Sequence, residues 1–209
     1  PREQLRGYFT GSGDDECTGC GGPVGLTHDG NTFRMWYNGL PGPLETLPHM
    51  ACAYAESDDG IEWRKPHLRL VKSLDGSLDN NLTNLIQNAV TVIDLGDTAE
   101  PDKRYRGTGV GAHIRATEEP GVYREHWPLD AHGRRINGMY LLYSADGLNW
   151  KYFQDSPVNF SQDSAYLVFD KPRNRFLASI KIEIRERHYD RRSHALISSV
   201  DGFQWDTPR

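Results

Sequence analysis

Residues 54–63 read YAESDDGIEW, and the core of this stretch occurs twice more, as YSADGLNW at 143–150 and as SSVDGFQW at 198–205. All three copies share the pattern Ser-x-Asp-Gly-x-x-Trp. An Asp-Gly pair between two extended runs is typical of a tight turn, because glycine adopts the positive φ that the turn requires. We expect the aspartate to accept hydrogen bonds from backbone N–H groups of the turn. The tryptophan would fill the space between neighbouring units.

Strand patterns lead into each of these turns, and no stretch of ten residues has helical periodicity. Each unit is predicted to contain three strands, the Asp-Gly turn and a short fourth strand carrying the tryptophan. The predicted strands are 20–30, 32–39, 49–57 and a strand at Trp63; then 88–96, 105–114, 137–146 and a strand at Trp150; then a hairpin over 165–182 with its turn at Pro172–Asn174, followed by 194–202 and a strand at Trp205.

Four antiparallel strands, repeated along a chain, indicate an all-β fold of the β-propeller type. We expect one domain over residues 1–209, with blades at roughly 15–66, 79–153 and 160–209. Propellers have four to eight blades, and this chain provides three. Either the sequence is part of a longer protein, whose remaining sequence supplies the other blades, or partner chains complete the ring, and we favour the first possibility.

Charge argues against two classes of partner. The formal net charge is −5, so nucleic acids and anionic membranes are not expected to bind. No apolar run approaches the roughly 18 residues of a transmembrane helix, and no signal peptide is recognisable.

The three cysteines have two interpretations. Cys17, Cys20, His49 and Cys52 have a spacing that four-coordinate zinc would tolerate. Alternatively, Cys20 and Cys52 are small buried strand residues and Cys17 lies in a loop. We favour the second interpretation and expect neither a metal nor a cofactor.

Several segments, in order, resemble the five-bladed propeller glycosidases, the superfamily of invertases, levansucrases and arabinanases. They are FRMWYNG, ACAYAESDDGIEWRKPHLRLV, GSLDNNL, PDKRYRG, YSADGLNW and DSAYLVFDKPRNRFLASIKI. The resemblance covers roughly residues 20–209 and is nearest to the bacterial branch related to families 32 and 43. It implies a central funnel with acidic residues where the innermost strands begin.

The resemblance also implies three catalytic carboxylates. Glycoside hydrolysis needs one carboxyl group that is protonated and one that is ionised. Asp15 precedes the first inner strand, although its acidic neighbours also fit a solvated loop. Asp163 stands where the superfamily has its axial aspartate. Glu183 completes the predicted set, unless it belongs to an exposed charged strand end.

Four residues are candidates for binding the sugar. Asn84 and Asn88 precede or begin an inner strand, and amides suit either sugar hydroxyls or turns. Trp127 lies in a long insertion at 121–135, where it could stack on a sugar ring. Arg185 shares a strand face with Glu183.

We therefore expect a glycosidase or transglycosidase acting on an oligo- or polysaccharide of plant or microbial origin. A non-catalytic carbohydrate-binding propeller is the alternative, and a structural or protein-interaction propeller is the third possibility. No motif in the sequence specifies a compartment, but degradation of polysaccharide would place a secreted protein in the extracellular or periplasmic space.

Overall fold

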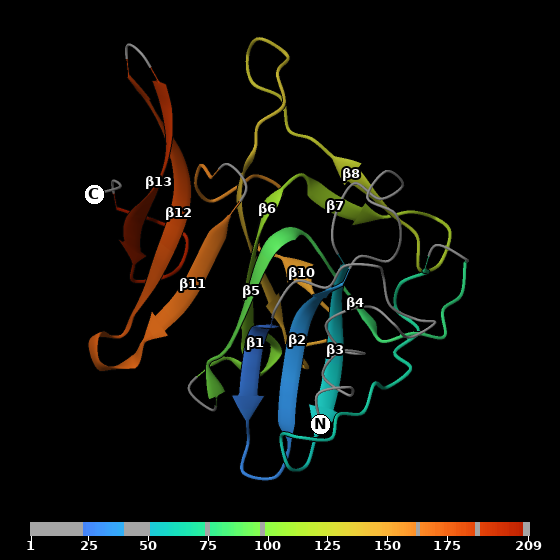
Figure 1. Cartoon of the computed structure of the whole chain (residues 1–209). Coiled ribbons are helices and arrows are strands. Elements are labelled where there is room, and N and C mark those ends of the chain that lie inside the picture. The colour runs from blue at the N-terminus through green and yellow to red at the C-terminus, as the bar shows by residue number, and fades with distance from the viewer. Residues whose placement is uncertain are drawn as a thin grey trace.

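The computed structural model describes residues 23–39, 51–73, 76–96, 99–161, 164–186 and 189–206. Nearly all regular structure in these ranges is β-strand (Figure 1). The helical elements described are two short 3-10 turns, η2 (Pro101–Lys103) and η3 (Lys171–Arg173). No helix in these ranges is long and apolar enough to cross a bilayer. The all-β class expected from the sequence is confirmed.

The strands form three antiparallel sheets in succession along the chain, and one separate hairpin. The first sheet has the order β1-β2-β3-β4, the second β5-β6-β9-β10 and the third β11-β12-β13, while β7 pairs with β8. The bounds are β1 Pro23–His28, β2 Phe33–Gly39, β3 Ala51–Ser57, β4 Leu82–Ile86, β5 Asn88–Asp94, β6 Tyr105–Gly111, β7 His113–Ala116, β8 Tyr123–His126, β9 Gly138–Ser144, β10 Lys151–Tyr152, β11 Ala165–Asp170, β12 Arg175–Glu186 and β13 Tyr189–Ser199.

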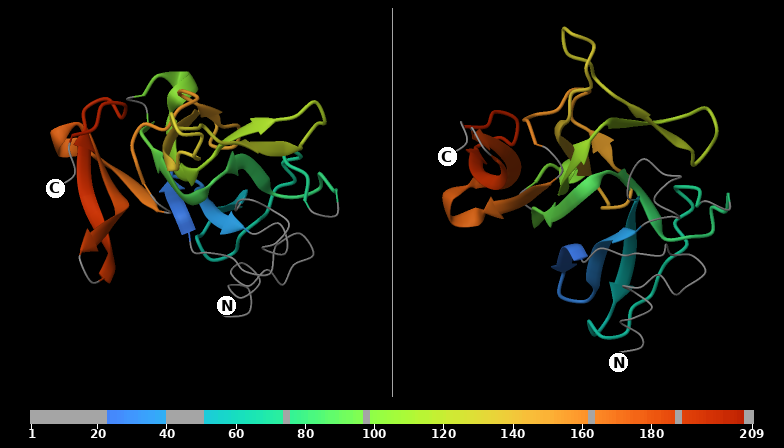
Figure 2. Two further views of the ribbon diagram at one scale, coloured as in Figure 1. Left: turned by 90° about the horizontal axis from the view of Figure 1, so that it is seen from above. Right: turned by 45° about the horizontal axis from the view of Figure 1, so that its top comes forward.

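The first strands of the three sheets lie side by side. β1 contacts β5, and β5 contacts β11. All three run in the same direction, downward in Figure 1, so they begin at one common end of the molecule. Figure 2 shows the third sheet on one side of the second sheet and the first sheet on the other. This arrangement is consistent with successive propeller blades.

The fourth strand differs from the expectation in the first sheet. After the first turn, the chain makes a single bridge between Glu56 and Arg64, and no strand forms at Trp63. The edge of this sheet is instead β4, which pairs with β3. Only the second sheet has the predicted short strand, β10, directly after its tryptophan. In the third sheet the corresponding contact is a hydrogen bond from the Asp206 N–H to the Ser198 carbonyl at 3.0 Å.

The predicted turns are confirmed at all three positions, and we call each Ser-x-Asp-Gly turn a corner. In each corner one aspartate oxygen accepts hydrogen bonds from two backbone N–H groups: Ile61 and Glu62 to Asp59, Leu148 and Asn149 to Asp146, and Phe203 and Gln204 to Asp201, all at 2.8–2.9 Å. The serine hydroxyl donates to the same oxygen and accepts from the glycine N–H. Each corner glycine has positive φ. The corner is therefore a self-contained hydrogen-bonded unit.

Apolar side chains fill both spaces between the sheets. Between the first and second sheets, Trp36 and Tyr54 pack with Tyr140 and Leu142. Between the second and third sheets, Leu141 packs in a cluster with Leu167 and Ile197 and with other residues of the third sheet. The second sheet is consequently buried on both faces.

The second corner joins the first two sheets directly. The Gly147 carbonyl accepts one hydrogen bond from the Trp150 indole at 2.9 Å and another from the Trp36 indole at 2.6 Å. Trp150 is 5% exposed and lies in the cluster between these sheets. The prediction that a corner tryptophan fills the space between units is confirmed here.

We predict that Gly147→Ala is more destabilising than Gly60→Ala. Both glycines have φ near +75°, so each alanine would cost about 1–2 kcal/mol in the left-handed region. At Gly147 a Cβ would also lie 2.5 Å from the Trp36 ring, whereas at Gly60 the nearest contact is 3.6 Å. This overpacking adds about 1–3 kcal/mol. Urea unfolding of both variants measures the difference, and equal losses would contradict the packing of the second corner on Trp36.

We also predict that the corners contribute to acid sensitivity. Hydrogen bonds from the Glu62 and Gln204 N–H groups hold the pKa values of Asp59 and Asp201 below their usual range. Burial acts to raise the pKa of Asp146, but hydrogen bonds from the Asn149 backbone and side chain outweigh it and lower that pKa.

Because the pKa of each aspartate is lower in the folded state, its ionised form stabilises the fold at pH values above the unfolded-state pKa of about 3.9. This stabilisation is lost as the pH falls through the folded-state pKa. Asp146→Asn keeps an accepting oxygen but does not titrate. Its free energy of unfolding should therefore decline less steeply than that of the wild type between about pH 5 and pH 2. Urea unfolding at several pH values measures both free energies. If they decline by the same amount over this range, Asp146 does not contribute to acid sensitivity.

Candidate functional site

The end of the molecule where β1, β5 and β11 begin is the place where the sequence predicts the sugar site. Two projections rise at this end in Figure 1: the tip of the β12–β13 hairpin, and the segment that follows β8. β6 ends and β9 begins at the same end, since Gly111 pairs with Gly138 and Val110 pairs with Asn88.

A buried polar cluster lies at this end of the second sheet. It consists of Gln87, His113, Tyr140 and Tyr152, and we call it the His113 cluster. The Gln87 side-chain amide donates to the Tyr152 hydroxyl at 2.5 Å and to the Ala112 carbonyl at 2.7 Å. The His113 ring lies 4.0 Å from the Tyr152 ring and 5.9 Å from the Tyr140 ring, between centroids.

Glycine in β6 makes room for this cluster. A Cβ at Gly109 would overlap with the Gln87 Cβ, at a separation that two carbon atoms cannot adopt. Gln87 can therefore pack onto β6 only because residue 109 has no side chain.

Three atoms of the His113 cluster are buried and form no hydrogen bond with the described residues, although the Asp155 carboxylate lies 3.5 Å from one of them, His113 Nε2. They are Gln87 Oε1, His113 Nε2 and Tyr140 Oη. Buried polar atoms normally have a partner, and a missing one points to water or another polar group. Donors and acceptors of this kind suit a hydroxyl group, which both donates and accepts. Sequence analysis did not identify these residues.

The protonation of His113 follows from its neighbours. Burial lowers its pKa, which the nearby Asp155 carboxylate partly offsets, so the ring is neutral at pH 7. The Arg115 Nε–H donates to His113 Nδ1 at 3.1 Å, and the ring proton of the neutral form therefore lies on Nε2. Asp155 is 3.5 Å from Nε2. Burial raises the pKa values of Tyr140 and Tyr152 to about 12, and both phenols are uncharged.

Asn84 is held by the backbone of Trp150. Its side-chain oxygen accepts from the Trp150 N–H at 2.6 Å, and its amide donates to the Trp150 carbonyl at 3.2 Å. β4 is thereby tied to the second corner. Asn88 is the first residue of β5 and pairs with Val110.

Trp127 lies half-buried at the base of the segment that follows β8. Its indole N–H donates to the Glu125 carboxylate at 2.5 Å. The Arg135 guanidinium carbon lies 5.2 Å from the centre of the ring. The ring is therefore oriented by two charged neighbours.

Glu183 and Arg185 lie on the rising part of β12, opposite Arg192 and Asp190 of β13. Glu183 is exposed. Asp15 and Asp163, the other two predicted carboxylates, lie outside the described residues. The structure thus locates one of the three predicted catalytic side chains.

The predicted zinc ligands Cys17, Cys20 and His49 also lie outside the described residues. Cys52 is fully buried in β3, in the cluster between the first two sheets, and burial raises its thiol pKa to about 12. A thiolate ligand is disfavoured in such a place. Within the described ranges, no group of three or more His, Cys, Asp or Glu side chains could hold a metal.

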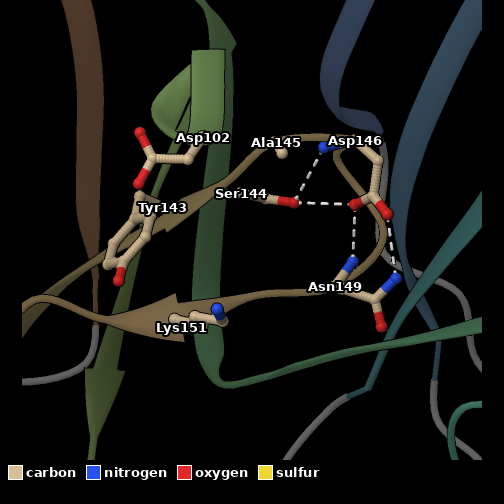
Figure 3. Close-up of a pocket in the computed structure, with 7 residues that line it drawn as sticks. All are labelled: Asp102, Tyr143, Ser144, Ala145, Asp146, Asn149 and Lys151. Atoms are coloured by element: carbon tan, nitrogen blue, oxygen red, sulfur yellow. Dashed lines mark hydrogen bonds between the residues drawn. The ribbon is translucent and has the colours of Figure 1, made fainter. Parts of the chain in front are cut away.

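Two hollows lie at the opposite end, where β1 and β5 finish. One, of about 140 Å³, adjoins the second corner (Figure 3) and is lined by Asp102, Tyr143, Ser144, Ala145, Asp146, Asn149 and Lys151. The other, of about 470 Å³, is lined by Thr27, His28, Asp29, Asp94, Gly96, Arg104 and Lys171.

Three of the carboxylates at these hollows, Asp146, Asp29 and Asp94, accept hydrogen bonds, and Asp102 also lines the first hollow. Asp146 holds the corner, as Figure 3 shows. Hydrogen bonds from the Thr32 and Asn31 N–H groups and from Arg34 keep the pKa of Asp29 well below its usual range. Asp94 accepts two hydrogen bonds from Arg104, at 3.0 and 2.9 Å. A general acid must carry a proton near neutral pH, and the lowered pKa values of Asp29 and Asp146 do not suit that role.

Comparison with known proteins gives a structural match but no sequence match. No family profile matches the chain, and no curated protein matches it in sequence. Among solved structures, a family 32 β-fructofuranosidase from the silkworm Bombyx mori is similar with a TM-score of 0.51 and 16% identity. A mutant of the same enzyme, in complex with sucrose, gives a TM-score of 0.49 at 16% identity.

Both matches cover 90% of this chain and 34% of the other chain. The chain therefore spans about a third of the length of the structures it matches. At this identity the likeness concerns the fold alone.

We predict that replacing Tyr152 and replacing Tyr140 of the His113 cluster affect stability differently. Tyr152→Phe removes the acceptor of the Gln87 amide and of the Ile114 N–H, which donates to it at 3.1 Å, and should cost about 1–3 kcal/mol. Tyr140→Phe removes a hydroxyl without a partner and should leave stability nearly unchanged. Chemical unfolding of the two variants provides a matched comparison. A large loss in Tyr140→Phe would show that its hydroxyl is bound after all.

Proposed function

We propose that this chain is part of a β-propeller glycoside hydrolase or transglycosidase. The observation that carries the proposal is that the first strands of three successive sheets lie side by side and begin at one end. Residues that lead into such strands converge on a common axis. Hydrolysis of a glycosidic bond needs two carboxyl groups facing each other across a cavity, about 5–10 Å apart.

Asp15, Asp163 and Glu183 are the proposed catalytic carboxylates. Asp15 precedes the first sheet and Asp163 precedes β11 in the sequence, while Glu183 lies on β12 where this strand rises at the same end. One carboxyl group donates a proton to the leaving oxygen, and an ionised one attacks the sugar or activates water.

Asn84, Asn88, Trp127 and Arg185 are the proposed sugar ligands. Trp127 directly follows β8 and has a flat aromatic ring on which a sugar could stack, and Arg185 lies near the end of β12. Because Asn84 also holds the Trp150 backbone, its replacement should reduce stability together with binding.

The proposal includes a complete ring of five four-stranded blades, of which this chain supplies three. The substrate would be an oligo- or polysaccharide from plants or microbes. Since one structurally similar protein is a β-fructofuranosidase, fructosides belong in the first panel of substrates beside arabinans and other plant polysaccharides.

Asp163→Asn is predicted to lower the rate of sugar release by about 10²–10⁴-fold, the usual contribution of a positioned acid or base. The full-length protein would be incubated with the panel, and reducing sugars would be quantified. Asp58→Asn is the matched control, because Asp58 is an exposed carboxylate paired with Arg64 at the first corner. Equal rates for wild type and Asp163→Asn would remove Asp163 from the mechanism.

The same experiment separates hydrolysis from carbohydrate binding alone. A binding propeller would retain affinity for a polysaccharide, measured by retardation in an affinity gel, while the wild type releases no sugar. That result would replace the proposed hydrolase with the carbohydrate-binding alternative.

A further inference from the structure

The β7–β8 hairpin has one face made of basic side chains. His113 of β7 pairs with His126 of β8, and Arg115 pairs with Arg124. Cross-strand partners lie on the same face of a sheet, and so do alternate residues of one strand. These four side chains therefore share one face, which we call the basic face. Its histidine in β7 is buried, and the other three residues are exposed.

The basic face is short of negative partners. Like charges on cross-strand partners repel each other, so Arg115 and Arg124 need a compensating charge. Within the described part of the chain, Asp155 is the one carboxylate that pairs with this face: its oxygens lie 3.2 Å from Arg115 Nη2 and 3.5 Å from His113 Nε2. Arg124 and His126 form no hydrogen bond or ion pair with the described residues. A single aspartate thus leaves one of the two arginines uncompensated.

The guanidinium group of Arg115 is held in a fixed orientation. Its Nε–H donates to His113 Nδ1 at 3.1 Å, and its Nη2 donates to Asp155 at 3.2 Å. The His113 ring in turn packs on the Tyr152 ring, 4.0 Å away between centroids. Cβ atoms of cross-strand partners lie about 4.5–5.5 Å apart, so the Arg124 guanidinium can reach the same oxyanion as Arg115. Two adjacent guanidinium groups suit carboxylate or sulfate oxygens, which they bind through charge-assisted hydrogen bonds.

The basic face adjoins the segment that is proposed to bind sugar. Trp127 directly follows His126 in the sequence. Its indole N–H donates to Glu125, which pairs with Ile114 on the other face of the hairpin. The hairpin follows β6 directly and lies toward the upper end in Figure 1, where β5 begins. A ligand at the proposed sugar site would therefore have positive charge beside it.

We propose that the basic face binds the oxyanion of an acidic saccharide, either the carboxylate of a uronic acid or a sulfate ester, with Arg115 and Arg124 sharing the oxyanion. The inference rests on the proposed function and narrows its substrate class from polysaccharides in general to acidic ones. A neutral saccharide would leave the repulsion between the two arginines uncompensated. A nucleic acid is a poorer ligand, because the formal net charge of −5 repels an extended polyanion.

Binding of saccharides to the full-length protein tests the proposal. Oligogalacturonate, a sulfated galactan oligosaccharide and neutral galactan of matched length would be titrated into the protein in a calorimeter. At least one acidic ligand should bind about 10- to 100-fold more tightly than neutral galactan, the usual effect of hydrogen bonds to a charged group. The preference should shrink at high salt. Comparison of the two acidic ligands distinguishes a carboxylate from a sulfate ester.

Two variants should change this preference in opposite directions. Arg124→Gln removes an uncompensated guanidinium and should abolish the preference for the acidic ligand. Asp155→Asn removes the carboxylate that competes for Arg115 and should strengthen acidic binding about 2- to 5-fold, the usual weight of an exposed ion pair. Lys171→Gln is the matched control, because it removes one positive charge from the exposed turn η3 at the opposite end. None of the three should change the affinity for neutral galactan.

Several results would overturn the proposal. They are equal affinities of the wild type for acidic and neutral saccharides, an unchanged preference in Arg124→Gln, or an equal loss in Lys171→Gln, which would assign the effect to net charge alone. Tighter binding of single-stranded DNA of the same charge would replace the saccharide with a nucleic acid. Failure of the proposed function is seen separately. A protein that binds none of these saccharides overturns both proposals, whereas binding without a preference for acidic ligands removes only this one.

Discussion

The carbonyl oxygen of Gly147 accepts hydrogen bonds from two indole groups, one from its own corner and one from the preceding sheet. Because the corner is closed internally by Ser144 and Asp146, this carbonyl has a fixed direction. Trp36 can therefore be buried completely without an unsatisfied N–H group, which would otherwise be costly. The position of the second sheet on the first depends on this contact, and the common origin of the first strands depends on that position.

The end of the molecule where β1, β5 and β11 begin combines two kinds of feature. Trp127 follows β8 and Glu183 lies on β12, and the His113 cluster has three buried polar atoms that form no hydrogen bond with the described residues. A sugar offers hydroxyl groups that both donate and accept, and the neutral His113 and the uncharged Tyr140 offer matching chemistry without net charge. At the opposite end, Asp146 holds the second corner and Asp94 accepts hydrogen bonds from Arg104. Chemistry and topology thus favour the same end.

Local patterns predicted the parts of the fold that are determined locally. The three corners and the hairpin at Pro172–Asn174 depend on turn chemistry within a few residues, and the structure confirms them. The edge strand β4 was missed because its pairing with β3 crosses a long segment that carries no strand signal. The His113 cluster was missed for a related reason: Gln87 and Tyr152 are 65 residues apart and meet only after β10 has joined the second sheet. Of the three proposed catalytic carboxylates, only Glu183 lies within the described residues.

β4 and β5 are separated by Gln87 alone, so one continuous run from Leu82 to Asp94 is the edge of one sheet and the first strand of the next. Neither sheet can lose this segment without disturbing the other. Local openings normally involve separate cooperative units. A shared segment joins two such units into one, so the first two sheets should open together rather than singly. The first two sheets would then behave as one coupled unit rather than as two independent modules.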